Sequence, residues 1–348
     1  MSWQKTIERY GSLIEDGLKK YFVEIEKEAG EYHPFIEQIY SDLEGFVLRG
    51  GKKLASCSTL LTYKGYAGEL DDKIIDVCIG IELYRHAILI HDDLVDMSSL
   101  RRGGKTLHEI FKMNYGSRFG EGTAIFTGNI AYALALRAIM ASKFSEDKIK
   151  NALSLLSEGY RKVNESQILD LLFEYKDVDV DEWQIMASKR AASLFKVTLL
   201  IGAILGGAGE KDLNILKNVA KNIGYSFDIQ DDIIDTFSDE DQYGRPPCGD
   251  IALGKKPLHI IRALTSENEK KSEKLSDFIG TGSLSQEDVS QVRELVREAG
   301  GLEAAKKTSG EHAKEARKLI GRTTMGEEVK EFFNSLVAYM EENLDWYR

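Results

Sequence analysis

Residues 92–96 read Asp-Asp-Leu-Val-Asp and residues 231–235 read Asp-Asp-Ile-Ile-Asp, so one acidic pattern occurs twice in this chain of 348 residues. Both clusters lie in apolar stretches that are compatible with a helix. Residues four apart share a face of a helix, so the first and last aspartates of each cluster point the same way. Grouped carboxylates repel one another unless a cation lies between them. Because Mg²⁺ is held by carboxylates together with substrate phosphates, the two clusters predict a pocket for a metal-bound polyphosphate.

The amino-acid composition favours helices throughout the chain. Leu, Ile, Ala, Lys and Glu are abundant, and 43% of the residues are hydrophobic, which is enough for a substantial core. Long spans contain no proline, which favours helices further. The four prolines are Pro34, Pro246, Pro247 and Pro257. We therefore expect an all-α protein.

Apolar periodicity predicts where the helices lie. The stretch 121–142 is Ala-rich and apolar nearly all round, which is typical of a buried central helix. We find no linker between two domains, so we expect a single domain over residues 1–348. The predicted helices cover residues 1–30, 71–97, 121–142, 146–175, 181–206 and 211–237, with more from about 256 to the end. The predicted loops and breaks are 101–105, 238–250, 279–284 and 300–301.

Charge and cysteine content exclude several classes of protein. The net charge of −11 argues against general nucleic-acid binding, which requires a basic face. Cys57, Cys78 and Cys248 lack the spacing of a zinc site, so we expect reduced thiols in a cytoplasmic protein. No run of 18 apolar residues occurs, so we expect no transmembrane helix. The N-terminus carries acidic residues and does not resemble a signal peptide.

Basic residues near the acids are candidate ligands for phosphate. One pair follows a Gly-Gly turn, one follows the first acidic cluster, one lies mid-chain and one follows the second cluster. In that order the pairs are Lys52-Lys53, Arg101-Arg102, Lys189-Arg190 and Lys255-Lys256. Alone, each would be an ordinary solvated pair. Together with the acids they imply a diphosphate leaving group, because cations stabilise the charge that develops as it departs.

This combination of motifs resembles the trans-isoprenyl diphosphate synthases (polyprenyl synthetases), in particular the geranylgeranyl diphosphate synthase type. The likeness runs from about residue 45 to residue 262 and continues more weakly to the end. Either acidic motif alone is a weak signal, but both with Arg-Arg-Gly at the right offset are specific. The segments that carry the likeness are Asp92–Gly103, Phe227–Asp235, Gly50-Gly51-Lys52, Gln167 with Asp170, and Gly254-Lys255.

The resemblance implies an isoprenoid synthase fold, an antiparallel helical bundle around a deep apolar cavity, and a homodimer. It implies that an allylic diphosphate loses its diphosphate to give an allylic cation. Isopentenyl diphosphate attacks this cation through its double bond, a proton is lost, and the product is five carbons longer. Mg²⁺ is the implied cofactor, with three ions present when substrate is bound.

The resemblance also assigns roles to residues. The implied metal ligands are Asp92, Asp93, Asp96, Asp231, Asp232 and Asp235. The implied catalytic residues, which hold the leaving diphosphate directly or through Mg²⁺, are Asp92, Asp96, Asp231, Arg101 and Lys255. The implied substrate-binding residues are Lys52, Tyr84, Arg85, Ala87, Arg101, Arg102, Gln167, Arg190 and Lys255.

The chain departs from the family pattern at several positions, some of them in the predicted site for isopentenyl diphosphate. The departures are Ala55 for Arg, Arg85 for His, Arg190-Ala191 for Lys-Thr, Asp228 for Gln and Asn129 for Asp. At the Lys-Thr pair, Lys189 is the alternative, if it serves out of register. We hypothesise that Arg85 supplies the guanidinium that is lost at position 55. Alternatively, Arg85 is an internal partner for Glu82 or for another acid nearby.

Product length follows from the helix before Asp92, where the resemblance places the floor of the tail pocket. The levels of this floor are Ala87, Tyr84 and Ile81, and each step of three residues descends about 5 Å. Ala87 leaves the upper level open and Tyr84 closes the next. We therefore expect a product of about twenty carbons.

Two rival functions remain open. A class I terpene cyclase shares the helical fold but usually keeps only one Asp-Asp-x-x-Asp motif. A non-catalytic or regulatory subunit of a heteromeric synthase would explain the departures at positions 55, 85, 191 and 228. Both acidic motifs are intact, which argues against each rival.

Overall fold

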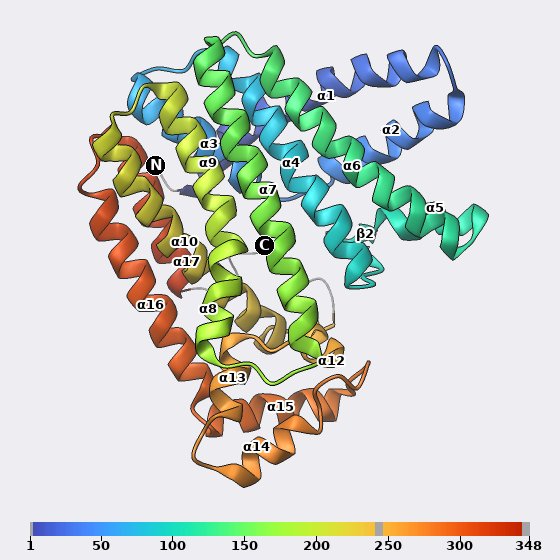
Figure 1. Ribbon diagram of the computed structural model, residues 1–348, viewed down its shortest axis with the longest axis vertical. Helices are drawn as coiled ribbons and strands as arrows, with labels where there is room; N and C mark the ends of the chain where they lie inside the picture. Colours follow the sequence, from blue (N-terminus) through green and yellow to red (C-terminus); the bar gives the residue numbers. More distant parts are fainter. Residues whose placement is uncertain (1–2, 241–245, 343–348) are drawn as a thin grey trace. The chain divides into compact units, whose positions relative to one another are not determined.

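The computed structural model describes residues 3–240 and 246–342, and these residues are almost entirely helical (Figure 1). The one sheet among them is a hairpin of β1 (Leu100–Arg101) and β2 (Gly104–Lys105). The prediction of an all-α protein is confirmed. The helices are α1 (Trp3–Gly30), α2 (Pro34–Leu48), α3 (Leu54–Ala67), α4 (Lys73–Val95), α5 (Leu107–Tyr115), α6 (Ser117–Ala141), α7 (Glu146–Glu174), α8 (Val180–Lys189), α9 (Ala191–Gly206), α10 (Glu210–Phe237), α12 (Gly249–Leu253), α13 (Leu258–Leu264), α14 (Glu269–Ser276), α15 (Gln286–Glu298), α16 (Gly301–Ile320) and α17 (Glu327–Glu342).

The chain forms two compact units. The first comprises Met1–Tyr160, Val197–Leu213 and Thr324–Phe332. The second comprises Arg161–Lys196, Asn214–Thr323 and Phe333–Arg348. The single domain expected over residues 1–348 stays a prediction.

The first unit is built around α4, which ends at the first acidic motif. Figure 1 shows α4 beside α6, and the two helices are in contact over much of their length. The side chains of Ile81, Tyr84 and Ala87 on α4 are fully buried. Apolar residues occur all round α4, and most of its residues are buried by neighbouring helices. The helix predicted over 71–97 is confirmed.

Helix α6 differs from its prediction because one of its faces is open. It packs against α4 and α5, and Ala124, Ala131 and Ala135 are buried there. On the other side, Phe126 is 68% exposed and Met140 is 56% exposed. The prediction of a helix buried nearly all round was wrong, because its apolar residues also form a face that nothing in the described chain covers.

No transmembrane helix was expected, and α6 bears on that expectation. Among the described residues, α6 is the one helix that is long and apolar enough to cross a membrane, by length and composition alone. The core helix of a folded protein passes the same test, and 44% of the relevant window of α6 is buried within the structure.

The second unit packs α10 against the helices that follow it. Ile229 and Ile233 of α10 are fully buried in a core that includes Trp183 of α8 and Leu258 of α13. This core holds α10 in place, so the second acidic motif lies on a helix that is buried on its apolar side.

The predicted helix 181–206 is broken at Arg190. α8 ends at Lys189 and α9 begins at Ala191, and Arg190 has φ −81° and ψ −107°, which is outside the helical region. Local sequence gives no sign of the break, because neither glycine nor proline lies near it. Its physical reason is the close approach of α10, since a Cβ at Gly224 would stand 2.3 Å from the Cα of Ala192.

The loop predicted over 238–250 lies partly outside the described residues, which omit 241–245. Its last two residues, Gly249 and Asp250, already belong to α12. The helices predicted over 146–175 and 211–237 are confirmed as α7 and α10.

Candidate active site

The first acidic motif lies at the C-terminal end of α4, in the first unit. Asp93 is 1% exposed and accepts a hydrogen bond from Arg101 Nε at 2.6 Å. Asp92 is half-buried and accepts from Arg101 Nη2 at 3.3 Å. Asp96 is also half-buried and lies one turn beyond Asp92, on the same face. Asp92 and Asp96 therefore present accessible oxygens, whereas Asp93 orients Arg101.

The hairpin of β1 and β2 carries Arg101 and Arg102 to the Gly-Gly turn. Arg102 Nη1 donates to the carbonyl of Gly50 at 3.2 Å and lies 3.4 Å from His86 Nε2. Gly51 has φ +87°, and a Cβ there would stand 2.5 Å from Cζ of Arg102. The turn therefore requires glycine for its backbone conformation and for space.

Arg49 fastens the other side of this hairpin. Its Nη1 donates to the carbonyl of Lys105 at 2.7 Å and to the carbonyl of Arg101 at 3.5 Å. Sequence reasoning missed Arg49, although it directly precedes the Gly-Gly turn. Its role is visible only in the folded chain, because its partners lie more than fifty residues away.

The two lysines after the Gly-Gly turn have different surroundings. Lys53 has φ +46° and donates to Glu15 at 2.9 Å, so its charge is used within the protein. Lys52 lies with Nζ 5.3 Å from the ring centroid of Trp3. Burial lowers the pKa of Lys52 to about 8. A half-buried ammonium group with a lowered pKa gains from an anionic ligand, which agrees with its prediction as a phosphate ligand.

Arg85 lies half-buried on α4, one turn from Glu82. Glu82 is bound instead by Ser56, whose hydroxyl donates to it at 2.5 Å. No ion pair joins Arg85 to Glu82 in the part of the chain that the structure describes. The alternative role of Arg85 as a partner for Glu82 therefore gains no support.

Tyr84 meets two other tyrosines within the first unit. Its ring lies edge-on to Tyr160, with centroids 6.0 Å apart, and Tyr160 stacks on Tyr132 at 3.9 Å. The hydroxyl of Tyr84 has no hydrogen-bond partner among the described residues. Ala87, one turn nearer the acidic motif, is also fully buried. Tyr84 is thus a large, enclosed side chain next to a small one, as the predicted pocket floor requires.

The second acidic motif lies near the C-terminal end of α10, in the second unit. Asp231 is half-buried, whereas Asp232 and Asp235 are buried. Asp235 accepts from the backbone N–H of Asp250 at 3.3 Å and so fastens the start of α12. Burial raises the pKa of Asp232 well above its ordinary value, while Arg190 opposes the shift.

Arg190 lies among three carboxylates. Its Nε donates to Asp228 at 2.7 Å and its Nη2 to Asp232 at 3.2 Å, and Nη1 lies 3.8 Å from Asp170. Burial raises the pKa of Asp228 to about 6, and the charge of Arg190 opposes this shift. Arg190 therefore binds side chains of its own unit. One of them belongs to Asp228, at which the chain departs from the family pattern.

The remaining predicted ligands also lie in the second unit. Lys255 Nζ lies 3.5 Å from Asp170 and 3.6 Å from Asp250, and the residue is buried. Gln167 is half-buried on α7, one turn before Asp170. Lys256 donates to the carbonyl of Phe173 at 2.6 Å, and Lys189 pairs with Glu165 at 2.7 Å, so both have structural partners.

The carboxylates of the two motifs fit Mg²⁺. Among the described residues, no group of three or more His, Cys, Asp or Glu side chains is placed to hold a metal ion. Mg²⁺ usually takes only one or two carboxylates and completes its shell with water and substrate phosphates. Asp92 and Asp96 in one unit, and Asp231 in the other, are half-buried, which suits that mode of binding.

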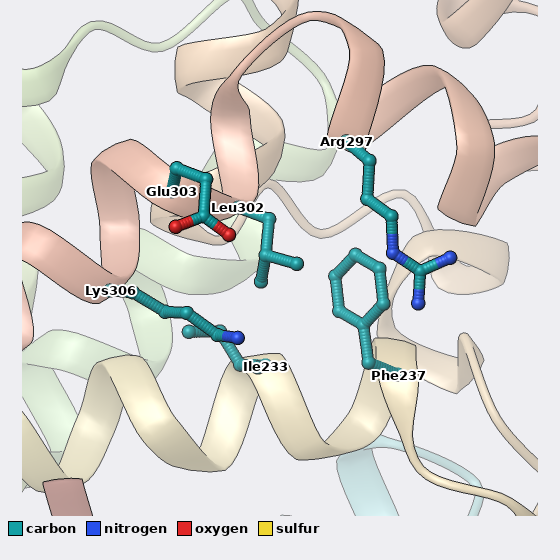
Figure 2. Close-up of a pocket in the computed structure, with 6 residues that line it drawn as sticks. All are labelled: Ile233, Phe237, Arg297, Leu302, Glu303 and Lys306. Carbon is teal, nitrogen blue, oxygen red and sulfur yellow. The ribbon is translucent and has the colours of Figure 1, made fainter. Parts of the chain in front are cut away.

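A separate cavity of about 340 Å³ occurs in the second unit, between α10, α15 and α16 (Figure 2). Ile233 and Phe237 form part of its apolar lining. Ile233 lies two residues after Asp231, which is a rotation of about 200° around the helix. The cavity is therefore on a different face of α10 from Asp231, and none of the predicted site residues lines it.

The chain is similar in sequence to a known family of proteins. The sequence model of the family described as "Polyprenyl synthetase" matches residues 36–296. A short chain isoprenyl diphosphate synthase of Methanothermobacter thermautotrophicus is 32% identical over 80% of this chain and 82% of its own. A geranylfarnesyl diphosphate synthase of Aeropyrum pernix is 30% identical over 85% of this chain and 91% of its own.

The chain is also similar in fold to solved structures. A geranylgeranyl pyrophosphate synthase from Corynebacterium glutamicum, complexed with isoprenyl diphosphate and magnesium, has a TM-score of 0.90 at 21% identity. That match covers 98% of this chain and 99% of the other. A geranylgeranyl pyrophosphate synthetase from Pyrococcus horikoshii has a TM-score of 0.83 at 23% identity, with 98% of both chains covered. At these identities the likeness establishes the fold alone, and that fold is the predicted isoprenoid synthase fold.

Proposed function

Because the chain belongs to the polyprenyl synthetase family, we propose that it is a prenyltransferase that condenses isopentenyl diphosphate with an allylic diphosphate. The observation that carries this proposal is the state of the two acidic motifs. In each motif at least one aspartate is only half-buried, while a neighbouring aspartate holds an arginine. This arrangement suits a site that binds a charged, metal-complexed diphosphate.

The proposed reaction begins when the C–O bond of the allylic diphosphate breaks and its electron pair leaves with the diphosphate. Asp92, Asp96 and Asp231 would hold Mg²⁺, with three ions when substrate is bound, and the metal would supply positive charge to the leaving group. Arg101 and Lys255 are the proposed direct ligands of that group. Both lie beside aspartates that already orient them.

The double bond of isopentenyl diphosphate then attacks the allylic cation and forms the new C–C bond. A proton leaves the resulting cation, and the departed diphosphate is its proposed acceptor. Lys52, Arg85 and Arg102 are the proposed ligands of the isopentenyl diphosphate. The hydrogen bonds of Arg102 to the Gly-Gly turn support this assignment, because they hold its guanidinium against the turn that directly precedes Lys52.

We propose a product of about twenty carbons. The fully buried Tyr84, enclosed against Tyr160, supports a floor at that level, and the small Ala87 supports an open level before it. Relatives of this chain include geranylgeranyl diphosphate synthases, which fits this length.

We also propose that the protein is a homodimer formed through α6. Exposed Ile125, Phe126 and Met140 support this, because large exposed apolar faces mark interaction surfaces. A cytoplasmic location is our proposal as well. It is supported by Cys57, Cys78 and Cys248, which are buried free thiols in the structure, as expected in a reducing compartment.

An incorporation assay tests the proposed function. The protein is incubated with radiolabelled isopentenyl diphosphate, Mg²⁺ and each of the dimethylallyl, geranyl and farnesyl diphosphates. We expect elongated prenyl diphosphates, and loss of activity when EDTA removes the metal. Hydrocarbon from an allylic diphosphate alone would instead indicate a terpene cyclase. No product from any primer would indicate a subunit that needs a partner chain.

A further inference from the structure

The guanidinium of Arg190 is shared between carboxylates from two helices of the second unit. Asp228 and Asp232 come from α10, and Asp170 comes from α7. Nε and Nη2 make hydrogen bonds to Asp228 and Asp232, whereas Nη1 lies 3.8 Å from Asp170, beyond hydrogen-bond distance. The shortest of these contacts, at 2.7 Å, is the one to Asp228.

The local fold explains why this arginine reaches those acids. Arg190 occupies the break between α8 and α9, and Gly224 on α10 allows the backbone of α10 to approach Ala192 there. Gly224, Asp228 and Asp232 follow one another at intervals of four, so they share one face of α10. That face therefore presents both carboxylates to the break at which Arg190 lies.

Asp228 is not part of the Asp-Asp-x-x-Asp pattern, and its side chain is only 7% exposed. It is therefore poorly placed to meet a metal-bound diphosphate itself. Its bond to Nε fixes the plane of the guanidinium, because Nε lies closest to the stem of the side chain. With that plane fixed, Nη2 faces both oxygens of Asp232, at 3.2 and 3.3 Å.

We propose that Asp228 is a positioning residue that acts through Arg190 on the second acidic motif. Asp228 anchors Arg190, and Arg190 holds Asp232, so the aspartates of the motif are kept in a fixed arrangement. The inference rests on the proposed function, since it assigns Asp231 to the metal-bound diphosphate. Without the anchor, the guanidinium redistributes between Asp232 and Asp170, and the motif loses its fixed arrangement.

A double-mutant cycle tests this inference, with kcat measured in the incorporation assay. We expect Asp228→Ala to lower kcat at least tenfold while the KM for isopentenyl diphosphate changes less than threefold. Asp228→Asn keeps an oxygen that accepts from Nε, and we expect it to restore kcat to within threefold of the wild type. We expect the double variant Asp228→Ala/Arg190→Ala to be no slower than Arg190→Ala alone, because Asp228 acts only through Arg190.

The matched control is Glu165→Gln, which breaks the ion pair of the adjacent residue Lys189 at the same helix break. We expect it to leave kcat unchanged. The inference is overturned if Asp228→Ala lowers kcat further in the Arg190→Ala background. It is also overturned if Asp228→Asn is as slow as Asp228→Ala, or if Glu165→Gln is as slow as either.

A binding measurement separates this inference from the proposed reaction. Inorganic pyrophosphate with Mg²⁺ should raise the melting temperature of the wild type. In Asp228→Ala, we expect the half-maximal shift to require at least tenfold more pyrophosphate. If that change occurs although the wild type elongates no primer, the proposed function fails and the positioning role stands. If pyrophosphate shifts both proteins equally, the positioning role fails. If Asp228→Ala does not fold, Asp228→Leu takes its place, because leucine has a similar size but cannot accept a hydrogen bond from Nε.

Discussion

The guanidinium of Arg102 lies directly over Gly51, so closely that a Cβ at this glycine would stand 2.5 Å from its Cζ. The same arginine donates to the carbonyls of Arg49 and Gly50, and Arg49 donates back to the β1–β2 hairpin. The turn that presents Lys52 and the hairpin that presents Arg101 are therefore held together by two arginines. Substitutions in either segment should affect both.

We expect Gly51→Ala to raise the KM for isopentenyl diphosphate at least tenfold, because the new methyl group displaces Arg102. Steady-state kinetics measure this. Gly50→Ala is the matched control, since Gly50 also has a positive φ, +54°, but has no atom within 4 Å of its ideal Cβ. Both variants incur backbone strain of roughly 1–2 kcal/mol. An equal rise of KM in both would mean that strain, and not displacement of Arg102, is responsible.

The lowered pKa of Lys52 predicts a pH dependence of binding. Burial brings this pKa to about 8, so the free enzyme carries the ammonium charge below that pH and loses it as the pH rises. If the charge binds diphosphate, the KM for isopentenyl diphosphate should rise steadily between pH 8 and pH 10. Lys52→Arg keeps its charge throughout this range, since arginine is always protonated, and its profile should be flat. A rise of the same size in Lys52→Arg would assign the titration to another group.

Arg85→His restores the residue of the family pattern and tests whether Arg85 replaces the arginine missing at Ala55. We expect the KM for isopentenyl diphosphate to rise about tenfold or more, since a hydrogen bond to a charged group contributes roughly 1.5–3 kcal/mol. Lys53→Ala is the control, because Lys53 is bound to Glu15 and should not contact substrate. The hypothesis is wrong if Arg85→His leaves this KM unchanged.

Tyr84→Ala should lengthen the product beyond twenty carbons, because it removes the proposed floor beside Tyr160. Chromatography of the dephosphorylated products measures their length, and thermal melting checks that the variant folds. Ile81→Ala is the control one turn deeper, where Tyr84 still closes the pocket above it. A floor elsewhere is indicated if Tyr84→Ala gives the wild-type product, or if Ile81→Ala alone lengthens it.

Phe126→Glu should convert the proposed homodimer into monomers, because it places a charge in the apolar face of α6. Light scattering coupled to size-exclusion chromatography measures the mass. Tyr32→Glu is the control, since Tyr32 is 66% exposed, much like Phe126 at 68%, but lies outside α6. A wild-type protein that is already monomeric, or a dimer that survives Phe126→Glu, would remove α6 from the assembly.

The sequence predicted those parts of the fold that depend on local pattern. The helix over 71–97 could be predicted because its apolar residues and the acidic motif at its end are continuous in sequence. The break at Arg190 could not, since its cause is the close approach of Gly224, more than thirty residues away. The open face of α6 was missed for a related reason, because composition shows that a face is apolar but not whether another helix covers it.

In the candidate site, too, local sequence motifs could be predicted, whereas tertiary contacts could not. The acidic motifs and the arginines after the first of them have a spacing that can be recognised from sequence. The partners that determine the role of each residue cannot be recognised from sequence, because Glu15 binds Lys53 and Asp228 binds Arg190 only after folding. Arg49 had no signal of its own, because its hydrogen bonds go to backbone carbonyls of the hairpin.

The three thiols give the chain a practical advantage. Burial raises the pKa of Cys57, Cys78 and Cys248, so little reactive thiolate forms near neutral pH. Maleimide dyes and spin labels should therefore leave the native protein almost unmodified. A cysteine introduced at an exposed position would then be the main site of attachment, which makes the unaltered chain a suitable background for fluorescence studies of substrate-induced motion.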